Sequence, residues 1–226
     1  KELLDQMIAC NTAIAQEGMH GDYGANIGKV IAIRKDLPSL LKAYAAAGSD
    51  ARMNGCELPV VINSGSGNQG LTVSVPLIIY AEREHLDKEK LYRALVISNL
   101  TAIHLKTEIG RLSAFCGAVS AGAACGAGLA YLKDASEEVM NHTIVNALAI
   151  TSGIICDGAK ASCAAKIAVS VEAGILGYDM YMNGQQFYGG DGIISKGIEN
   201  TIHNIGVLGS QGMASTDQEI IKIMCE

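Results

Sequence analysis

The sequence predicts a mainly α-helical fold, with a single multi-helix domain over residues 1–226. Apolar residues recur every three or four positions through most of the second half, which is the spacing of amphipathic helices. Glycines interrupt these runs where helices would end, and no repeat or low-complexity linker divides the chain. Hydrophobic residues make up 49% and charged residues 18%, so the chain can bury a large core.

Three helices are expected in the first fifty residues. Residues 1–17 carry apolar side chains at helical spacing and end at Gly18, which opens a glycine-rich loop. Residues 26–35 form a short helix, and Pro38 begins a third helix that closes at Gly48.

The next segment is harder to assign. Residues 49–70 are expected to be irregular and to include a glycine-rich loop. Residues 71–80 are rich in β-branched side chains, so they fit a minor strand by propensity. They fit a buried helix equally well, and periodicity alone does not decide between the two.

From Asp87 onwards the pattern is helical. Helices are expected over 87–107, 112–132, 136–152, 162–182, 192–207 and 215–225. The range 112–132 carries no charge and is long enough to cross a membrane. Glycine, alanine and serine dominate it, however, which favours a buried small-residue helix in a soluble core.

Composition excludes several classes of partner. The net charge of -6 and the absence of a Lys/Arg run argue against nucleic acid, as do the scarce aromatics, 4% with no Trp. Seven cysteines in a chain of this length match no small disulfide scaffold, and no signal peptide opens it, so a cytoplasmic protein is expected. The chain begins without Met, as a fragment of a longer protein would. Packing within the domain or across a homo-oligomer interface stays open.

Three cysteines stand among small residues: Cys116, Cys156 and Cys163. Three thiols in such a setting suit a metal or an iron–sulfur cluster, although cysteine is also a common core residue. Cys125 lies nine residues after Cys116 on the same expected helix and faces the other side, so it is assigned to packing.

The Cys156–Cys163 spacing needs a helix break, which Asp157-Gly158 supplies, and Ser162 then serves as the N-cap that places Cys163 at a helix start. A helix N-terminus favours a thiolate. Zinc would need a fourth ligand such as His142 or His203, for which no motif argues. Spacing alone leaves packing and metal binding both open.

A second candidate site is the run Ser64-Gly65-Ser66-Gly67-Asn68-Gln69 with Gly70. Its backbone N–H groups and neutral side-chain donors suit a carboxylate or a phosphate. It matches neither the phosphate-binding loop of nucleotide hydrolases nor the dinucleotide-binding fingerprint, and an ordinary polar turn is the alternative. The chain has no nucleophile-elbow motif, and His20, His85 and His104 are expected to be structural or solvated.

Taken together, four motifs resemble the L-cysteine desulfidase family, a UPF0597-type group also labelled serine dehydratase alpha-subunit-like. They are Ser49-Asp-Ala-Arg-Met, Asn63-Ser-Gly-Ser-Gly-Asn-Gln-Gly70, Arg111-Leu-Ser-Ala-Phe-Cys116 and Cys156-Asp-Gly-Ala-Lys-Ala-Ser-Cys163-Ala-Ala-Lys166. The resemblance covers essentially the whole chain.

The resemblance implies a cytoplasmic lyase that converts L-cysteine to pyruvate, ammonia and hydrogen sulfide. It implies a [4Fe–4S] cluster on Cys116, Cys156 and Cys163, with one iron left open as a Lewis acid. The Ser64–Gly70 run would then hold the substrate carboxylate. L-serine dehydratase is a close alternative, because hydroxide can leave in place of sulfide.

One departure from the family limits this reading. Family members carry an N-terminal Gly-Cys-Thr-Glu-Pro segment whose cysteine is the expected general base, and no such segment occurs here. Cys10 lies in a different, helical context. The chain therefore resembles the C-terminal portion of such an enzyme, with the base in a missing N-terminal segment. A non-catalytic metabolite-binding or assembly domain is the third reading.

Overall fold

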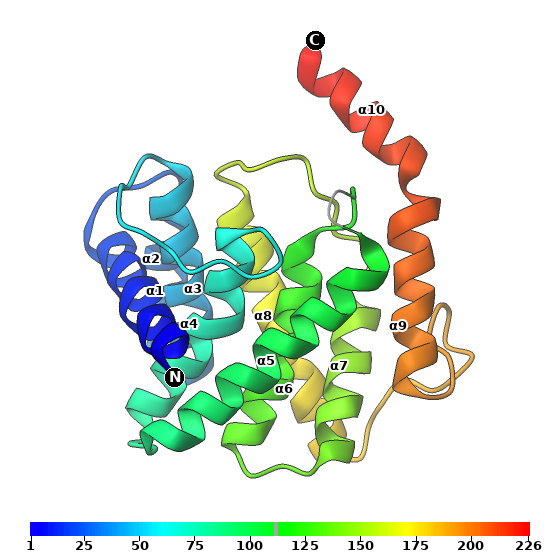
Figure 1. Cartoon of the computed structure of the whole chain (residues 1–226), viewed down its shortest axis with the longest axis horizontal. Helices are drawn as coiled ribbons and strands as arrows, with labels where there is room; N and C mark the ends of the chain where they lie inside the picture. The colour runs from blue at the N-terminus through cyan, green and yellow to red at the C-terminus, as the bar shows by residue number, and fades with distance from the viewer. Residues whose placement is uncertain (111–112) are drawn as a thin grey trace.

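Helices form most of the described chain, which confirms the mainly α-helical prediction (Figure 1). The computed structural model describes residues 1–110 and 113–226. In order, the elements are α1 (Glu2–His20), α2 (Ile27–Ala32), α3 (Leu37–Met53), α4 (Gly67–Arg83), α5 (Lys88–Ile109), α6 (Gly117–Leu132), α7 (Glu137–Thr151), α8 (Cys163–Met182), α9 (Ile198–Val207), η1 (Leu208–Gly212) and α10 (Ala214–Cys225).

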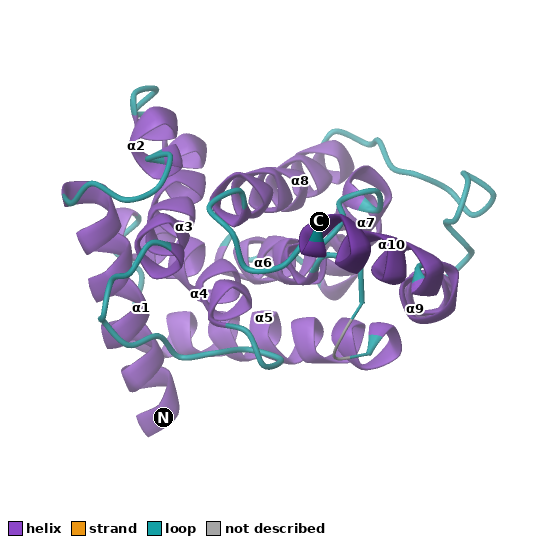
Figure 2. Ribbon diagram, turned by 90° about the horizontal axis from the view of Figure 1, so that it is seen from above, coloured by secondary structure: helices purple, strands orange, loops and turns teal. Residues whose placement is uncertain are grey.

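Helix α6 lies at the centre of the bundle (Figure 2). It packs against α4, α5, α7 and α8, and nearly all of its residues are buried. On one side α3 contacts α4 and α8 and carries α1 and α2, while α9 packs against α5 and α7 on the other side. Helix α10 extends from the body of the bundle and has no buried residue (Figure 1).

The contact between α6 and α8 depends on glycine. A Cβ atom at Gly122 would lie 2.3 Å from the carbonyl oxygen of Ser170, and one at Gly126 would lie 2.8 Å from Cα of Gly174. The two backbones therefore touch directly, which larger residues would prevent. This confirms the expected buried helix of small residues. Over the described ranges no helix is long and apolar enough to cross a membrane.

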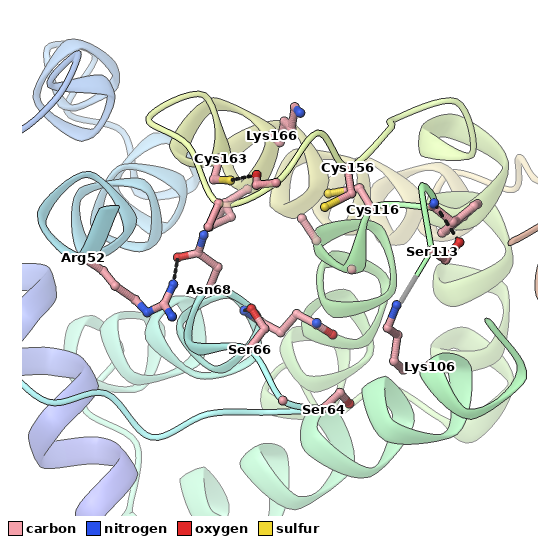
Figure 3. A pocket seen from close by; sticks show the side chains of 18 residues that line it. Arg52, Ser64, Ser66, Asn68, Lys106, Ser113, Cys116, Cys156, Cys163 and Lys166 are labelled. Atoms are coloured by element: carbon pink, nitrogen blue, oxygen red, sulfur yellow. Dashed lines mark hydrogen bonds between the residues drawn. The ribbon is translucent and has the colours of Figure 1, made fainter. Parts of the chain in front are cut away.

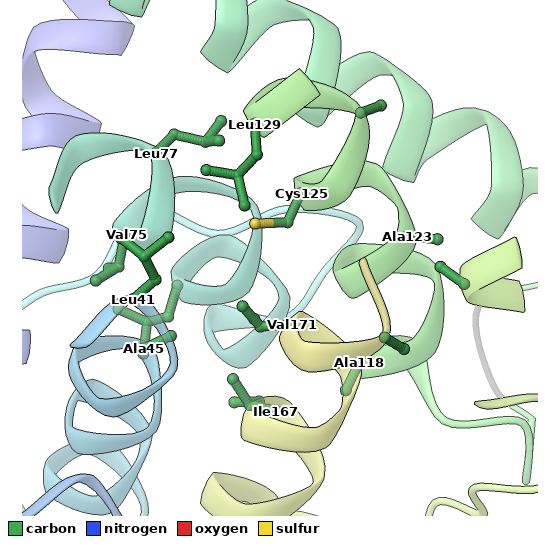
Figure 4. Close-up of a cluster of buried hydrophobic side chains, with 14 of the residues drawn as sticks. Leu41, Ala45, Val75, Leu77, Ala118, Ala123, Cys125, Leu129, Ile167 and Val171 are labelled. Carbon is green, nitrogen blue, oxygen red and sulfur yellow. The ribbon is translucent and has the colours of Figure 1, made fainter. Parts of the chain in front are cut away.

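Cys125 is part of the hydrophobic core, as its position on the helix predicted. Its side chain is fully buried and lies among Val75, Leu77 and Leu129 (Figure 4). Burial raises the pKa of its thiol, so Cys125 stays neutral at physiological pH.

Two glycines that were expected to end helices lie inside them. Helix α1 continues past Gly18 to His20, and α3 continues past Gly48 to Met53, so residues 49–53 are helical and not irregular. A Cβ atom at Gly18 would lie 1.9 Å from the carbonyl oxygen of Ala47. Gly18 therefore marks a close approach of α1 and α3, not a helix end.

Three other expectations also need correction. Residues 71–80 are helical, within α4, and the strand alternative is wrong; the segment is buried on nearly all sides, so its apolar residues show no single face. Helix α9 begins at residue 198, not 192. The expected start at residue 112 lies outside the described residues, but 113–116 are not helical and α6 begins at Gly117.

Candidate active site

The N-termini of three helices meet at one cavity of about 340 Å³ at one end of the bundle (Figure 3). Helices α4, α6 and α8 all begin there, and the last turn of α5 contributes Lys106. The cavity is lined by Arg52, Ser64, Gly65, Ser66, Asn68, Gln69, Lys106, Ser113, Phe115, Cys116, Gly117, Ala118, Cys156, Gly158, Ala159, Cys163, Lys166 and Ile167.

Cys116 and Cys156 are brought together by a short antiparallel bridge. The N–H of Cys156 donates to the carbonyl of Ala114 at 2.6 Å, and the N–H of Cys116 donates to the carbonyl of Ile154 at 3.2 Å. Ser113 fixes this segment, because its hydroxyl donates to the carbonyl of Gly209 at 2.6 Å. In Figure 3 the two sulfur atoms lie side by side. Sequence spacing did not predict this bridge.

The hydrogen bond between the thiols of Cys116 and Cys156 shifts their pKa values in opposite directions. A hydrogen bond to Cys156, together with burial, raises the pKa of Cys116. The same hydrogen bond lowers the pKa of Cys156, and the Gly158 N–H and the Lys166 ammonium add to this effect. The pair therefore carries its negative charge on Cys156 and its proton on Cys116.

Cys163 is the first residue of α8, as predicted, and lies apart from the other two sulfurs in Figure 3. Its sulfur accepts a bond from the Lys160 N–H at 3.5 Å and lies 3.6 Å from the carbonyl oxygen of Gly158. Ser162 stands at the N-cap, but its side chain makes no capping bond. An ion pair between Asp157 and Lys166 ties the loop to α8.

The three thiols line one cavity, although no three His, Cys, Asp or Glu side chains in the described ranges converge closely enough to hold a single metal ion. An iron–sulfur cluster distributes its ligands over several irons, so the sulfurs need to surround a space and not a point. The donor set fits that requirement. His142 stacks on Tyr181 with ring centroids 4.4 Å apart, and His203 pairs with Glu108; neither lines the cavity.

The predicted carboxylate site consists of a tight turn followed by a helix start. Asn63 and Ser66 exchange backbone hydrogen bonds of 3.1 and 2.9 Å around Ser64 and Gly65, whose φ angles are 49° and 81°. Positive φ angles at both central positions are those of a type I′ turn, in which glycine is favoured because it adopts them without strain. Ser66 caps α4, so Gly67 is helical and not part of the loop.

Two of the glycines allow close packing and do not serve as exposed donors. A Cβ atom at Gly67 would lie 2.3 Å from Nε of Arg52, and one at Gly70 would lie 2.0 Å from the carbonyl oxygen of Val61. Gln69 is 93% buried and packs against Gly117, and its Oε1 has no hydrogen-bond partner in the described part of the chain.

Arg52 and Lys106 were missed as site residues by sequence reasoning. Arg52 lies near the end of α3, and its Nη1 contacts Oδ1 of Asn68 at 3.4 Å. It belongs to a motif that carried the family resemblance, but nothing in the sequence placed it beside the Ser64–Gly70 run. Lys106 is only 7% exposed, and burial lowers the pKa of its ammonium group.

The cavity favours anions. Arg52, Lys106 and Lys166 line it, and no Asp or Glu is among its lining residues in the described ranges. Three helix N-termini add positive potential to that of the side chains. Thiolates, carboxylates and anionic clusters are therefore stabilised in a chain whose net charge is -6. The exposed side chains of His20, His85 and His104 lie elsewhere, as expected.

Known proteins match this chain over nearly all of its length. It is 64% identical to a UPF0597 protein of Desulfitobacterium hafniense over 99% of the chain and 53% of the relative. It is 53% identical to a UPF0597 protein of Lachnoclostridium phytofermentans, over 99% of the chain and 54% of the relative. The corresponding protein of Finegoldia magna is 51% identical, over 100% and 54%.

The chain thus spans about half the length of these curated relatives. No solved structure matches it. The family described as serine dehydratase alpha chain matches residues 1–222, and the chain belongs to that family.

Proposed function

We propose that this chain carries the cofactor-binding and substrate-binding core of an iron–sulfur-dependent lyase. The reaction converts L-cysteine and water to pyruvate, ammonia and hydrogen sulfide. The observation that carries this proposal is that three thiols share one cavity with three helix N-termini and no carboxylate among its described lining residues. That environment suits thiolate ligands and a carboxylate-bearing substrate together.

Cys116, Cys156 and Cys163 would hold a [4Fe–4S] cluster. When bound, the cluster supplies a Lewis-acidic iron with an open position for the departing sulfur. Cys156 already carries the negative charge of its pair with Cys116, so it is prepared to act as a ligand. Cys116 must lose its proton and give up its hydrogen bond to Cys156 before it can ligate.

The substrate carboxylate would bind between Arg52 and the start of α4. Arg52 supplies charge and two-pronged donor geometry, and Ser66, Asn68 and Gln69 supply neutral polar groups beside it. Replacing Ser66 and Asn68 with Ala is expected to raise KM strongly in the loaded enzyme. An unchanged KM would exclude this carboxylate site.

The general base that removes the α-proton is assigned to the part of the longer relatives that this chain does not span. Co-expression of this chain with the part of such a relative that this chain does not span tests that assignment. Sulfide release from L-cysteine should require both parts.

L-serine dehydration is the second candidate. The family description, serine dehydratase alpha chain, specifically favours it. The same carboxylate site would serve L-serine, with hydroxide as the leaving group in place of sulfide. Parallel assays of sulfide from L-cysteine and pyruvate from L-serine, at equal loading with iron, separate the two substrates.

Anaerobic reconstitution with iron and sulfide tests the core of the proposal. The chain should bind iron and develop thiolate-to-iron absorbance, and Cys116→Ala, Cys156→Ala and Cys163→Ala should each lower both. Cys125→Ala is the matched control, because Cys125 is a buried thiol of α6 that lies in the core and does not line the cavity. Equal iron in the ligand variants and the parent would exclude the cluster.

A further inference from the structure

Lys106 is a buried cation that the proposed function leaves without a role. It lies in the last turn of α5, is 93% buried and lines the cavity. Among the residues described, its side-chain ammonium takes part in no hydrogen bond or ion pair. The negatively charged groups that act on it are Cys156 and Asp217 of α10. A buried ammonium without a close partner is costly, and an anionic ligand bound beside it would offset that cost.

The position of Lys106 identifies the part of the ligand that it faces. In Figure 3 Arg52 lies beside Asn68 on one side of the cavity, and Lys106 lies on the opposite side, towards Cys116 and Ser113. An amino acid whose carboxylate binds Arg52 therefore directs its side chain towards Lys106 and the thiols. This step rests on the proposed function, which assigns the carboxylate to Arg52.

We infer that Lys106 selects the side chain of the ligand. The site takes small L-α-amino acids whose β-substituent accepts a hydrogen bond and carries, or develops on cleavage, a negative charge. A cation held in a buried position, as Lys106 is, stabilises such a group far more than one in solvent does. Apolar and positively charged β-substituents gain nothing from Lys106 and are disfavoured.

L-aspartate and L-asparagine probe this inference because they have nearly the same shape and differ by one negative charge. Their affinities for the 226-residue chain, without reconstitution, can be measured by calorimetry. The quantity of interest is the preference for aspartate over asparagine, compared between the parent and Lys106→Met. That comparison cancels every other charge in the cavity. Lys106→Met is expected to reduce the preference about tenfold, which is a usual size for one buried charge contact.

Three further variants complete the experiment. Lys90→Met removes a positive charge from the opposite end of the same helix, where Lys90 pairs with Asp134, and should leave the preference unchanged. Lys106→Arg keeps the charge and should retain most of it. Lys106→Gln replaces Lys106→Met if the latter fails to fold, which circular dichroism would show.

A preference that changes less than twofold in Lys106→Met would overturn the inference. Failure of the parent to bind either amino acid would also overturn it. The first result leaves the proposed function intact, because the amino acids still bind. The second also contradicts the carboxylate site at Arg52, whereas cluster formation on the three cysteines is measured separately by iron content and absorbance.

Discussion

Asn11 is expected to hold the segment that leads to the Ser64–Ser66 turn in place. It is fully buried in α1 and accepts a hydrogen bond from the Val61 N–H at 2.8 Å. Its Nδ2 contacts the carbonyl oxygens of Val61 and Gly70, each at 3.3 Å, and Oγ of Ser74 at 2.9 Å. One side chain thus connects three parts of the chain: α1, the segment between α3 and α4, and α4 itself.

Asn11→Ala leaves the Val61 N–H without a partner in a partly buried position, which costs about 1–3 kcal/mol. The Gly70 carbonyl loses less, because it still accepts from Oγ of Ser74 at 2.7 Å. With the remaining bonds included, the free energy of unfolding should fall by about 3 kcal/mol. For a chain of this size that corresponds to a drop in Tm of roughly 6–12 °C.

Denaturant and thermal unfolding followed by far-ultraviolet circular dichroism measure this change, since the chain has no Trp. Thr12→Val is the matched control. The Thr12 hydroxyl, one residue away, is buried and has no hydrogen-bond partner among the described residues, so the substitution should be neutral or slightly stabilising. If Asn11→Ala unfolds within about 0.5 kcal/mol of the parent, the hydrogen bonds of Asn11 do not position this segment.

Three more predictions concern a closely packed glycine, a thiol of the cavity and a buried carboxyl group. Gly70→Ala places a Cβ atom 2.0 Å from a backbone carbonyl and should lower the free energy of unfolding by at least about 1–3 kcal/mol, whereas Gly153→Ala meets nothing within 4 Å and should be tolerated in the same melts. Without a cluster, Cys156 should react with iodoacetamide at neutral pH faster than an ordinary thiol, because its pKa is lowered; mass spectrometry that finds exposed Cys225 faster would contradict this. Burial raises the pKa of Asp50, so its folded form binds a proton more tightly than the unfolded chain and this contribution to stability is lost as pH rises through the raised pKa. The stability of Asp50→Asn relative to the parent should therefore rise from pH 3 to pH 7. A difference in Tm between the two proteins that stays constant across that range would contradict the assignment.

The helical class could be read from the sequence because apolar spacing and small-residue content act locally. The glycines could not be interpreted in the same way. Gly18 and Gly48 look like helix ends by propensity, but tertiary contact overrides propensity: α1 approaches the Ala47 carbonyl at Gly18, and α3 continues through Gly48. The segment 71–80 showed no helical periodicity of apolar residues, because nearly all of its residues are buried.

Some residues of the candidate site could be identified from the sequence, and others could not. Cys116, Cys156 and Cys163 and the Ser64–Gln69 run were identified from motifs, and the cavity is lined by all of them except Gly67. The cations were not identified, because Arg52 reaches Asn68 across 16 residues and Lys106 belongs to a helix that showed no motif. Such placements depend on how helices pack, which local patterns do not encode.

In the proposed function, three thiolates hold a cluster with one iron open to substrate. Mössbauer spectroscopy of the chain reconstituted with ⁵⁷Fe, recorded with and without L-cysteine, tests it most directly. We expect a cluster spectrum in which a single iron site changes when L-cysteine is added, and loss of that spectrum in Cys156→Ala. A spectrum that L-cysteine leaves unchanged, or an undiminished cluster in Cys156→Ala, would contradict it.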